Sequence, residues 1–128
     1  MDRFAILSLP TFRDERGALT VLQDRLPFPI RRVFWIYGAD GLTRGGHRHH
    51  KTRQALIAVA GTVTVHMDDG QFRDDIVLDS ADRCLLVEPK DWHRMSFGPS
   101  SVLLAVASHS YDRADYIETP YPGGRTDA

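Results

Sequence analysis

The 128-residue sequence has one cysteine, little net charge and no long hydrophobic run. A lone Cys84 excludes a disulfide framework within the chain, which fits a reducing compartment. The formal net charge of −1, from 16 basic and 17 acidic residues, is unlike the basic surface that nucleic-acid binding usually requires. Apolar runs such as residues 101–108 are far shorter than the roughly 20 residues of a membrane span. We therefore expect neither nucleic acid nor membrane as a partner.

The first ten residues also lack the features of a secretory signal, because they have neither a basic start nor a sustained apolar stretch. Together with the cysteine count, this predicts a cytoplasmic protein. Hydrophobic residues make up 42% of the chain, which is enough for a core, and the length is typical of one compact domain. We expect a single domain over residues 1–128.

No long window repeats apolar residues at helical spacing; short β-rich runs recur instead. Asp68-Asp69-Gly70 is a strong hairpin signal, because glycine adopts positive φ at little cost. The runs cover residues 17–23, 31–38, 54–61, 62–69, 75–80, 83–89, 93–98 and 101–108. This pattern predicts an all-β fold, a sandwich or barrel of antiparallel strands. We expect the Pro- and Gly-rich tail, residues 119–128, to fray or to cross onto a neighbouring chain.

Three histidines stand together in the stretch His47-Arg48-His49-His50. On a strand, residues two apart share a face, so His47 and His49 point together while His50 points the other way. An imidazole has an ordinary pKa of about 6.5 and exchanges a proton readily near neutral pH. The pair can therefore transfer protons at adjacent carbons of one substrate. A metal site and a satisfied polar cluster without chemistry are the alternatives.

The spacing around this pair resembles the first motif of the cupin superfamily, which reads HxH, then a Glu, then a Gly. Gln54 and Gly61 occupy the last two positions, and Pro89 with His93 approximates the second cupin motif. The resemblance implies a small jelly-roll β-barrel, in agreement with the strand pattern. It also implies metal ligands at both HxH histidines, the Glu and the second-motif histidine. Because Gln54 is a neutral amide, the anionic ligand is missing, and we predict that the site uses no metal.

A narrower resemblance extends over nearly the whole chain, to the WxcM-like cupins that are nucleotide-sugar 3,4-ketoisomerases. Its most specific block is Arg44-Gly-Gly-His47-Arg-His49, which is similar to the family's RGxHAH signature. Further blocks in the same order are residues 14–19, 27–38, 68–70, 87–95 and 108–117. The resemblance implies an isomerase that moves a keto group between C4 and C3 of a dTDP-4-keto-6-deoxyhexose without a cofactor. It also implies a place in deoxysugar biosynthesis for lipopolysaccharide or another glycan.

The resemblance identifies His47 and His49 as the catalytic pair. The C4 ketone acidifies the hydrogen at C3, a histidine removes it to give an enediol, and proton return at C4 leaves the ketone at C3. Gln54 in place of a ligating Glu fits a reaction that needs no Lewis acid. The sequence leaves open which histidine serves which carbon and which configuration C4 acquires.

The substrate is expected to contact further residues around the pair. Arg44 has motif support and suits either a phosphate or an enolate oxygen. Arg32, Lys51 and Arg53 are additional candidates for the diphosphate. The predicted substrate-binding residues are Arg44, Gln54, Tyr37, Trp35, Arg32 and His93. Either aromatic has the shape to stack on the sugar or the base, and packing in the core is the default for each.

We expect a homodimer, as is common in this family, in which an N-terminal edge strand pairs with the partner. Two other functions stay open at this point: a metal-dependent cupin enzyme and a non-catalytic cupin that binds a nucleotide sugar. A 3,5-epimerase is disfavoured, because no block resembles the motif of its general-acid tyrosine.

Overall fold

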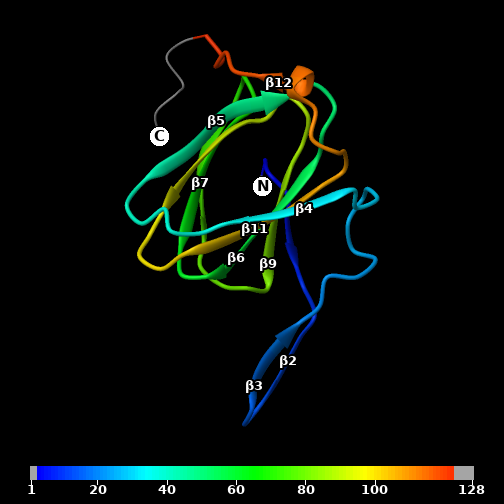
Figure 1. Ribbon diagram of the computed structural model, residues 1–128, viewed down its shortest axis with the longest axis vertical. Helices are drawn as coiled ribbons and strands as arrows, with labels where there is room; N and C mark the ends of the chain where they lie inside the picture. The colour runs from blue at the N-terminus through cyan, green and yellow to red at the C-terminus, as the bar shows by residue number, and fades with distance from the viewer. Residues whose placement is uncertain (1–2, 123–128) are drawn as a thin grey trace.

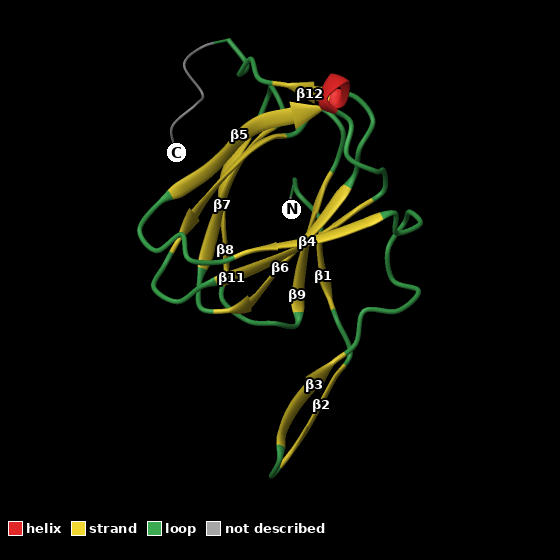
Figure 2. Cartoon of the chain, in the orientation of Figure 1, coloured by secondary structure: helices red, strands yellow, loops and turns green. Residues whose placement is uncertain are grey.

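The computed structural model describes residues 3–122, whose strands form two five-stranded antiparallel sheets that face one another (Figures 1 and 2). The first sheet has the order β1 (Ile6–Ser8), β9 (Arg83–Val87), β6 (Gln54–Ala60), β11 (Val102–Ala107) and β4 (Arg32–Ile36). The second has the order β12 (Tyr116–Ile117), β5 (Thr43–His49), β10 (Trp92–Phe97), β7 (Val63–Asp68) and β8 (Arg73–Leu78). This confirms the predicted all-β, jelly-roll-like barrel. A short 3₁₀ helix, η1 (Arg113–Asp115), leads into β12.

The main core lies between the two sheets, where alternate residues of each strand point inward. Its fully buried members include Leu56, Val63, Val65, Leu78, Leu85 and Leu103. β6 is buried on both faces over residues 54–58, which explains its continuous apolar run. Its outward residues join a second apolar cluster with Leu9, Cys84, Leu86 and Val106. Burial raises the pKa of the Cys84 thiol to about 11, so it remains a protonated core residue.

The predicted turn at Asp68-Asp69-Gly70 joins β7 to β8. Gly70 has φ of +97°, and its backbone N–H donates to the Asp68 carboxylate at 2.9 Å. The backbone N–H of Asp69 donates to the carbonyl of Phe72 at 3.1 Å. The sequence prediction of a hairpin here is confirmed, with glycine supplying the conformation that other residues adopt at a cost.

A two-stranded hairpin, β2 (Thr11–Asp14) and β3 (Gly17–Thr20), extends away from the barrel (blue in Figure 1). Phe12 lies opposite Leu19 in its register, and these side chains are 65% and 60% exposed. The sequence runs predicted β3 but not its partner β2. An isolated two-stranded hairpin is marginally stable in water. We therefore expect another surface to pack against this exposed apolar pair.

The described part of the C-terminal tail packs against the body of its own chain. The Arg48 guanidinium donates to the carbonyl of Thr119 at 3.2 Å and lies 4.0 Å from the centre of the Tyr121 ring. The Tyr121 hydroxyl donates to the carbonyl of Lys90 at 2.5 Å. Residues 119–121 are therefore held over β5, and the rest of the predicted tail, residues 123–128, lies outside the described residues.

Within residues 3–122, no helix is both long and apolar enough to cross a membrane.

Candidate active site

Two consecutive glycines shape strand β5 immediately before the histidine pair. Gly45 and Gly46 have φ of +92° and +91°, and the pairing between β5 and β10 shifts register at this point. Gly45 pairs with Arg94, whereas His47 pairs directly with His93. A Cβ at Gly45 would lie 3.0 Å from the His93 carbonyl oxygen, so a side chain would collide with the backbone there. The bulge thereby places His47 opposite His93.

Four aromatic rings then meet on the inner face of the second sheet. His47 and His49 share that face, as their spacing predicted, and their ring centroids are 5.1 Å apart. His93 lies 4.8 Å from His47. Tyr116 of β12 pairs with His49 across the strands, and its ring is 4.8 Å from His47 and 4.6 Å from His49. Register alone brings these four residues together from three strands.

Three of these rings, His47, His93 and Tyr116, border a cavity of about 180 Å³ between the two sheets. Pockets that hold whole drug-sized ligands usually measure ~300–1,000 Å³, so this cavity suits one ring-sized group. The first sheet contributes Phe34, Ile36, Gln54, Leu56, Leu103 and Ala105, and the second contributes Arg44, Gly45, His47, His93, Met95 and Tyr116. His49 lies behind these lining residues, with 1% of its surface exposed.

Burial keeps the three histidines uncharged. Burial, with a smaller effect from the neighbouring imidazoles, lowers the pKa of His47, His49 and His93 from 6.5 to about 4 in each case. The Arg32 charge adds a smaller effect in the same direction on the pKa of His47 and of His49. At neutral pH each ring is therefore a neutral base with an available lone pair, as proton abstraction requires.

The hydrogen bonds of His93 and His49 differ. The Nδ1 of His93 is 3.0 Å from the carbonyl oxygen of Asp91; because a carbonyl only accepts, Nδ1 carries the proton and Nε2 holds the lone pair. Both ring nitrogens of His49 are buried and lack a hydrogen-bond partner among the described residues. A buried polar atom left unpaired costs ~1–3 kcal/mol, so a substrate hydroxyl or carbonyl that reached His49 would relieve that cost.

A metal ion is the other ligand that this cluster can hold. One nitrogen from each of His47, His49 and His93 lies within 4.8 Å of the others. Neutral imidazoles are suitable ligands for Zn²⁺ or Fe²⁺. The cavity offers Gln54, a neutral amide, where an anionic oxygen would balance the charge of the ion. That the site works without a metal therefore stays a prediction.

The other predicted substrate-binding residues divide into two groups. Gln54 is buried and lines the cavity, and Arg44 stands exposed at its edge. Trp35 and Tyr37 do not reach the cavity, because they are 59% and 69% exposed. Phe34 and Ile36, on the opposite face of β4, line it instead. Side chains alternate along this segment, and the face that turns inward is the one without Trp35 and Tyr37.

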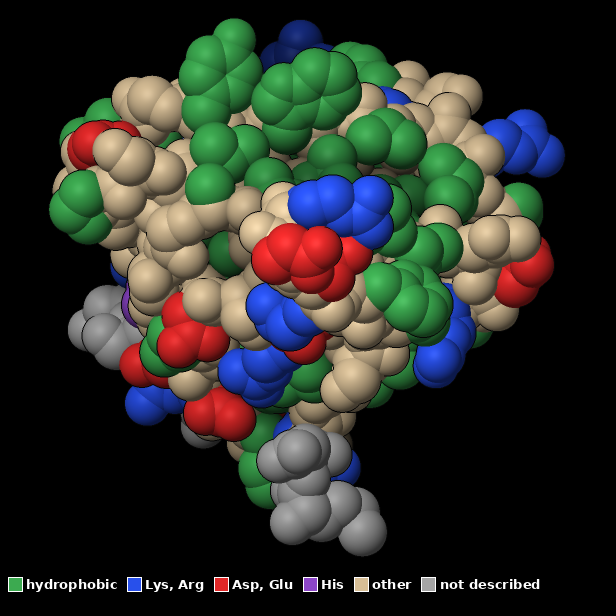
Figure 3. All heavy atoms as spheres, turned by 90° about the horizontal axis from the view of Figure 1, so that it is seen from below, with side chains coloured by type: hydrophobic (Ala, Val, Ile, Leu, Met, Phe, Trp, Pro, Cys, Tyr) green, Lys and Arg blue, Asp and Glu red, His purple; other side chains and the backbone are tan. Residues whose placement is uncertain are grey.

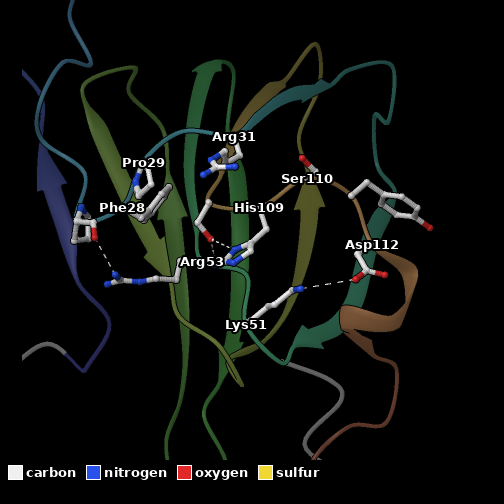
Figure 4. Close-up of a pocket in the computed structure, with 11 residues that line it drawn as sticks. Phe28, Pro29, Arg31, Lys51, Arg53, His109, Ser110 and Asp112 are labelled. Atoms are coloured by element: carbon white, nitrogen blue, oxygen red, sulfur yellow. Dashed lines mark hydrogen bonds and ion pairs between the residues drawn. The ribbon is translucent and has the colours of Figure 1, made fainter.

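Lys51 and Arg53 line a different hollow, of about 680 Å³, on the far side of the first sheet (Figure 4). Arg53 donates to Glu88 at 2.7 and 3.1 Å and to the carbonyl of Pro27 at 3.0 Å. Lys51 forms an ion pair with Asp112 at 3.8 Å. Both cations have protein partners and neither lines the histidine cavity, so their candidate role at the diphosphate stays a prediction.

The sequence prediction named no site residue within 108–117 and so missed Tyr116 and Asp115. Tyr116 lines the cavity. Asp115 is buried and accepts hydrogen bonds from the Thr52 hydroxyl and from the Lys51 backbone N–H. Burial raises the pKa of Asp115, but these hydrogen bonds outweigh it and hold the pKa below its usual value. The similarity of this segment to the family's closing block was the available signal.

A jelly-roll barrel with neutral histidines around a ring-sized cavity defines a cupin built for proton transfer. Comparison with known proteins narrows this class. The family described as FdtA, WxcM-like, C-terminal, matches residues 2–121, and the chain belongs to that family.

Characterised relatives include the TDP-4-oxo-6-deoxy-alpha-D-glucose-3,4-oxoisomerase of Aneurinibacillus thermoaerophilus. It is 36% identical over 116 residues, which cover 88% of this chain and 84% of the relative. A variant of the 3,4-ketoisomerase QdtA from Thermoanaerobacterium thermosaccharolyticum, solved with TDP-4-keto-6-deoxyglucose, is 32% identical with a TM-score of 0.88, covering 93% and 89% of the two chains. The WlaRB TDP-quinovose 3,4-ketoisomerase of Campylobacter jejuni is 34% identical with a TM-score of 0.86, covering 93% and 95%. A Legionella pneumophila 3,5-epimerase, 14% identical with a TM-score of 0.81, shares the fold.

Proposed function

We propose that this protein is a sugar 3,4-ketoisomerase acting on a TDP-4-keto-6-deoxyhexose. The observation that carries the proposal is the cluster of three neutral histidines, two of them buried and His47 half-buried, beside a cavity of one-ring size. The relatives named as 3,4-ketoisomerases support the same reaction. A product of this kind serves the synthesis of deoxysugar-containing glycans, such as lipopolysaccharide.

The reaction moves protons at two carbons and their two oxygens and leaves the composition of the sugar unchanged. A neutral histidine takes the proton from C3, the electron pair of the C–H bond forms the C3–C4 double bond, and the C4 ketone becomes an enediolate oxygen. A proton then adds to C4, and the proton of the C3 hydroxyl passes to the C4 oxygen, so that C3 becomes the new ketone and C4 carries the new hydroxyl. His47 and His49 are assigned to these transfers, because each ring is a neutral base near the cavity.

The nucleotide extends out of the cavity past Arg44. The cavity volume of about 180 Å³ accommodates the sugar alone, so the diphosphate lies at the rim. Arg44 is exposed there on β5, and a guanidinium binds phosphate oxygens in a bidentate manner. Of its two possible partners, a phosphate and an enolate oxygen, Arg44 therefore binds the phosphate.

The active form is a homodimer in the cytoplasm. Phe12 and Leu19 on the projecting hairpin are exposed, and so are Val33, Trp35 and Val59 on the outer face of the first sheet. Figure 3 shows hydrophobic side chains gathered on one face of the molecule. Association of two copies would bury these surfaces together. The lone buried Cys84 suits a reducing compartment.

Incubation with TDP-4-keto-6-deoxyglucose, followed by NMR of the sugar ring, tests the proposal. We expect the 3-keto isomer to accumulate with wild-type protein and with protein exhaustively treated with EDTA. TDP-sugar binding without any new sugar signal would support a non-catalytic binding protein instead. Turnover that is lost on chelation and restored by one divalent ion would identify a metal-dependent enzyme and overturn the metal-free prediction.

A further inference from the structure

Tyr116 is placed to take part in the reaction rather than only to close the barrel. It is half-buried on β12 and contacts the rings of both His47 and His49. Among the described residues that line the cavity, it is the one that carries a hydroxyl group. A phenol O–H both donates and accepts hydrogen bonds, so the group bound to it decides which role remains for the substrate.

Arg32 settles the direction of that hydrogen bond. Its Nη2 lies 3.5 Å from the Tyr116 Oη; because a guanidinium only donates, the tyrosine oxygen accepts and its proton is free for another acceptor. Arg32 shares a face of β4 with Phe34 and Ile36, which line the cavity. Its Nε is buried without a hydrogen-bond partner among the described residues, and its guanidinium lies 5.0 Å from the centre of the Phe34 ring.

The proposed reaction needs a positive charge or a hydrogen-bond donor near the C4 oxygen of the sugar. When C3 loses its proton, the C4 oxygen becomes negative, while the histidine that took the proton carries the balancing positive charge beside C3 rather than at that oxygen. Arg44 is exposed at the rim, where water weakens its field. Arg32 and Tyr116 are each half-buried, so a preorganised donor there is better shielded from water than Arg44 and more effective.

We propose that Tyr116, polarised by the Arg32 guanidinium, donates the hydrogen bond that stabilises the enediolate oxygen. Arg32 thereby acts through Tyr116 as a positioning residue and is not a partner of the diphosphate. This inference rests on the proposed ketoisomerase function, which supplies the enediolate.

Two variants test the pair. Tyr116→Phe keeps the ring against the histidines, and Arg32→Gln keeps a polar side chain but removes the charge. We expect each change to lower kcat by about 10²–10³-fold, the usual loss for one oxyanion donor, while TDP binding by calorimetry changes less than twofold. Because both act through one hydrogen bond, Arg32→Gln should lower kcat little further in a Tyr116→Phe background.

Tyr111→Phe is the matched control, since Tyr111 also lies near Arg32, at 5.6 Å, but does not line the cavity; its kcat should equal the wild-type value. Wild-type kcat in Tyr116→Phe, or additive losses in the double variant, would overturn the inference while leaving the ketoisomerase in place. A tenfold weaker affinity for TDP in Arg32→Gln with unchanged kcat would identify Arg32 as a residue that binds the diphosphate. A wild-type protein without turnover would instead refute the proposed function itself.

Discussion

His47 and His49 occupy different surroundings although they share one strand face. His47 borders the cavity and contacts three other rings, His49, His93 and Tyr116. His49 is fully buried, and the carboxylate of Asp115 acts on its pKa in the upward direction, against the larger effect of burial. The two imidazoles therefore differ in access to the substrate and in their charged neighbours, because the Asp115 carboxylate acts on His49. This difference is consistent with one acting first and the other returning the proton.

Replacing either histidine by asparagine separates chemistry from binding. The amide retains hydrogen bonding and approximate size but cannot accept a proton, so His47→Asn and His49→Asn should each lower kcat by about 10²–10⁴-fold. TDP affinity, measured by calorimetry, should stay within a few-fold of wild type. His50→Asn is the control, because His50 is exposed and points away from the pair. Near-normal turnover in both of the first two variants would move the chemistry to another residue, with His93 the next to replace.

The lowered histidine pKa values predict an unusual pH profile. With pKa values of about 4, the bases stay unprotonated well below neutrality, so kcat/KM should remain level from pH 8 to about 5. An acid limb centred near pH 6.5, the ordinary histidine value, would show that at least one base is exposed to water in the free enzyme.

Stability should fall over the same acid range. The histidine pKa is about 6.5 in the unfolded chain and about 4 in the folded one, so below pH 6.5 the unfolded state binds more protons. Folding stability is thus complete above pH 6.5 and declines as the pH falls toward 4. Thermal unfolding monitored by circular dichroism checks this, and it also shows which pH values are usable for the kinetic profile.

At the scale of elements, the eight predicted runs match β3, β4 and β6–β11, whereas β1, β2, β5 and β12 match none of the runs. Apart from the β7–β8 hairpin, the pairing of the strands was not predicted. The runs over residues 54–61 and 83–89 carry enough apolar, β-branched sequence to predict β6 and β9. β2, with four residues, and β12, with two, lack such a signal, because tertiary pairing alone defines them. Tyr116 was missed for that reason. The HxH spacing fixes which residues share a face, but nothing in β4 alone shows which of its faces turns inward.

The glycine bulge in β5 gives a prediction at this scale. Ala at either Gly45 or Gly46 adds backbone strain from positive φ, about 1–2 kcal/mol. Only Gly45→Ala also brings a Cβ to 3.0 Å from the His93 carbonyl, whereas the nearest atom to a Cβ at Gly46 is at 3.7 Å. Gly45→Ala should therefore be less stable than Gly46→Ala by about 1–3 kcal/mol in urea unfolding. It should also lose more activity, because His47 and His93 are displaced. Equal stabilities would show that the close approach is not what fixes the bulge.

For the whole molecule, the exposed hairpin predicts the oligomeric state. Light scattering coupled to size exclusion should give twice the chain mass of 14.5 kDa. Introducing charge at the apolar pair, as in Phe12→Glu/Leu19→Glu, should yield a monomer with an intact barrel, because the hairpin lies outside the main core. Glu15→Gln at the hairpin tip serves as the control and should remain dimeric. A monomeric wild-type protein, or a dimer that survives both charges, contradicts the assignment of this surface.

The central claim is that histidines move a proton between solvent and two adjacent sugar carbons. Conversion of TDP-4-keto-6-deoxyglucose in ²H₂O, followed by ¹H and ²H NMR of the product, tests it most directly. If His47 and His49 serve different carbons, the proton taken from C3 exchanges into solvent, and the 3-keto product carries deuterium at C4. A product that forms at the wild-type rate with no deuterium at C4 would mean direct internal hydrogen transfer, and it would contradict the account.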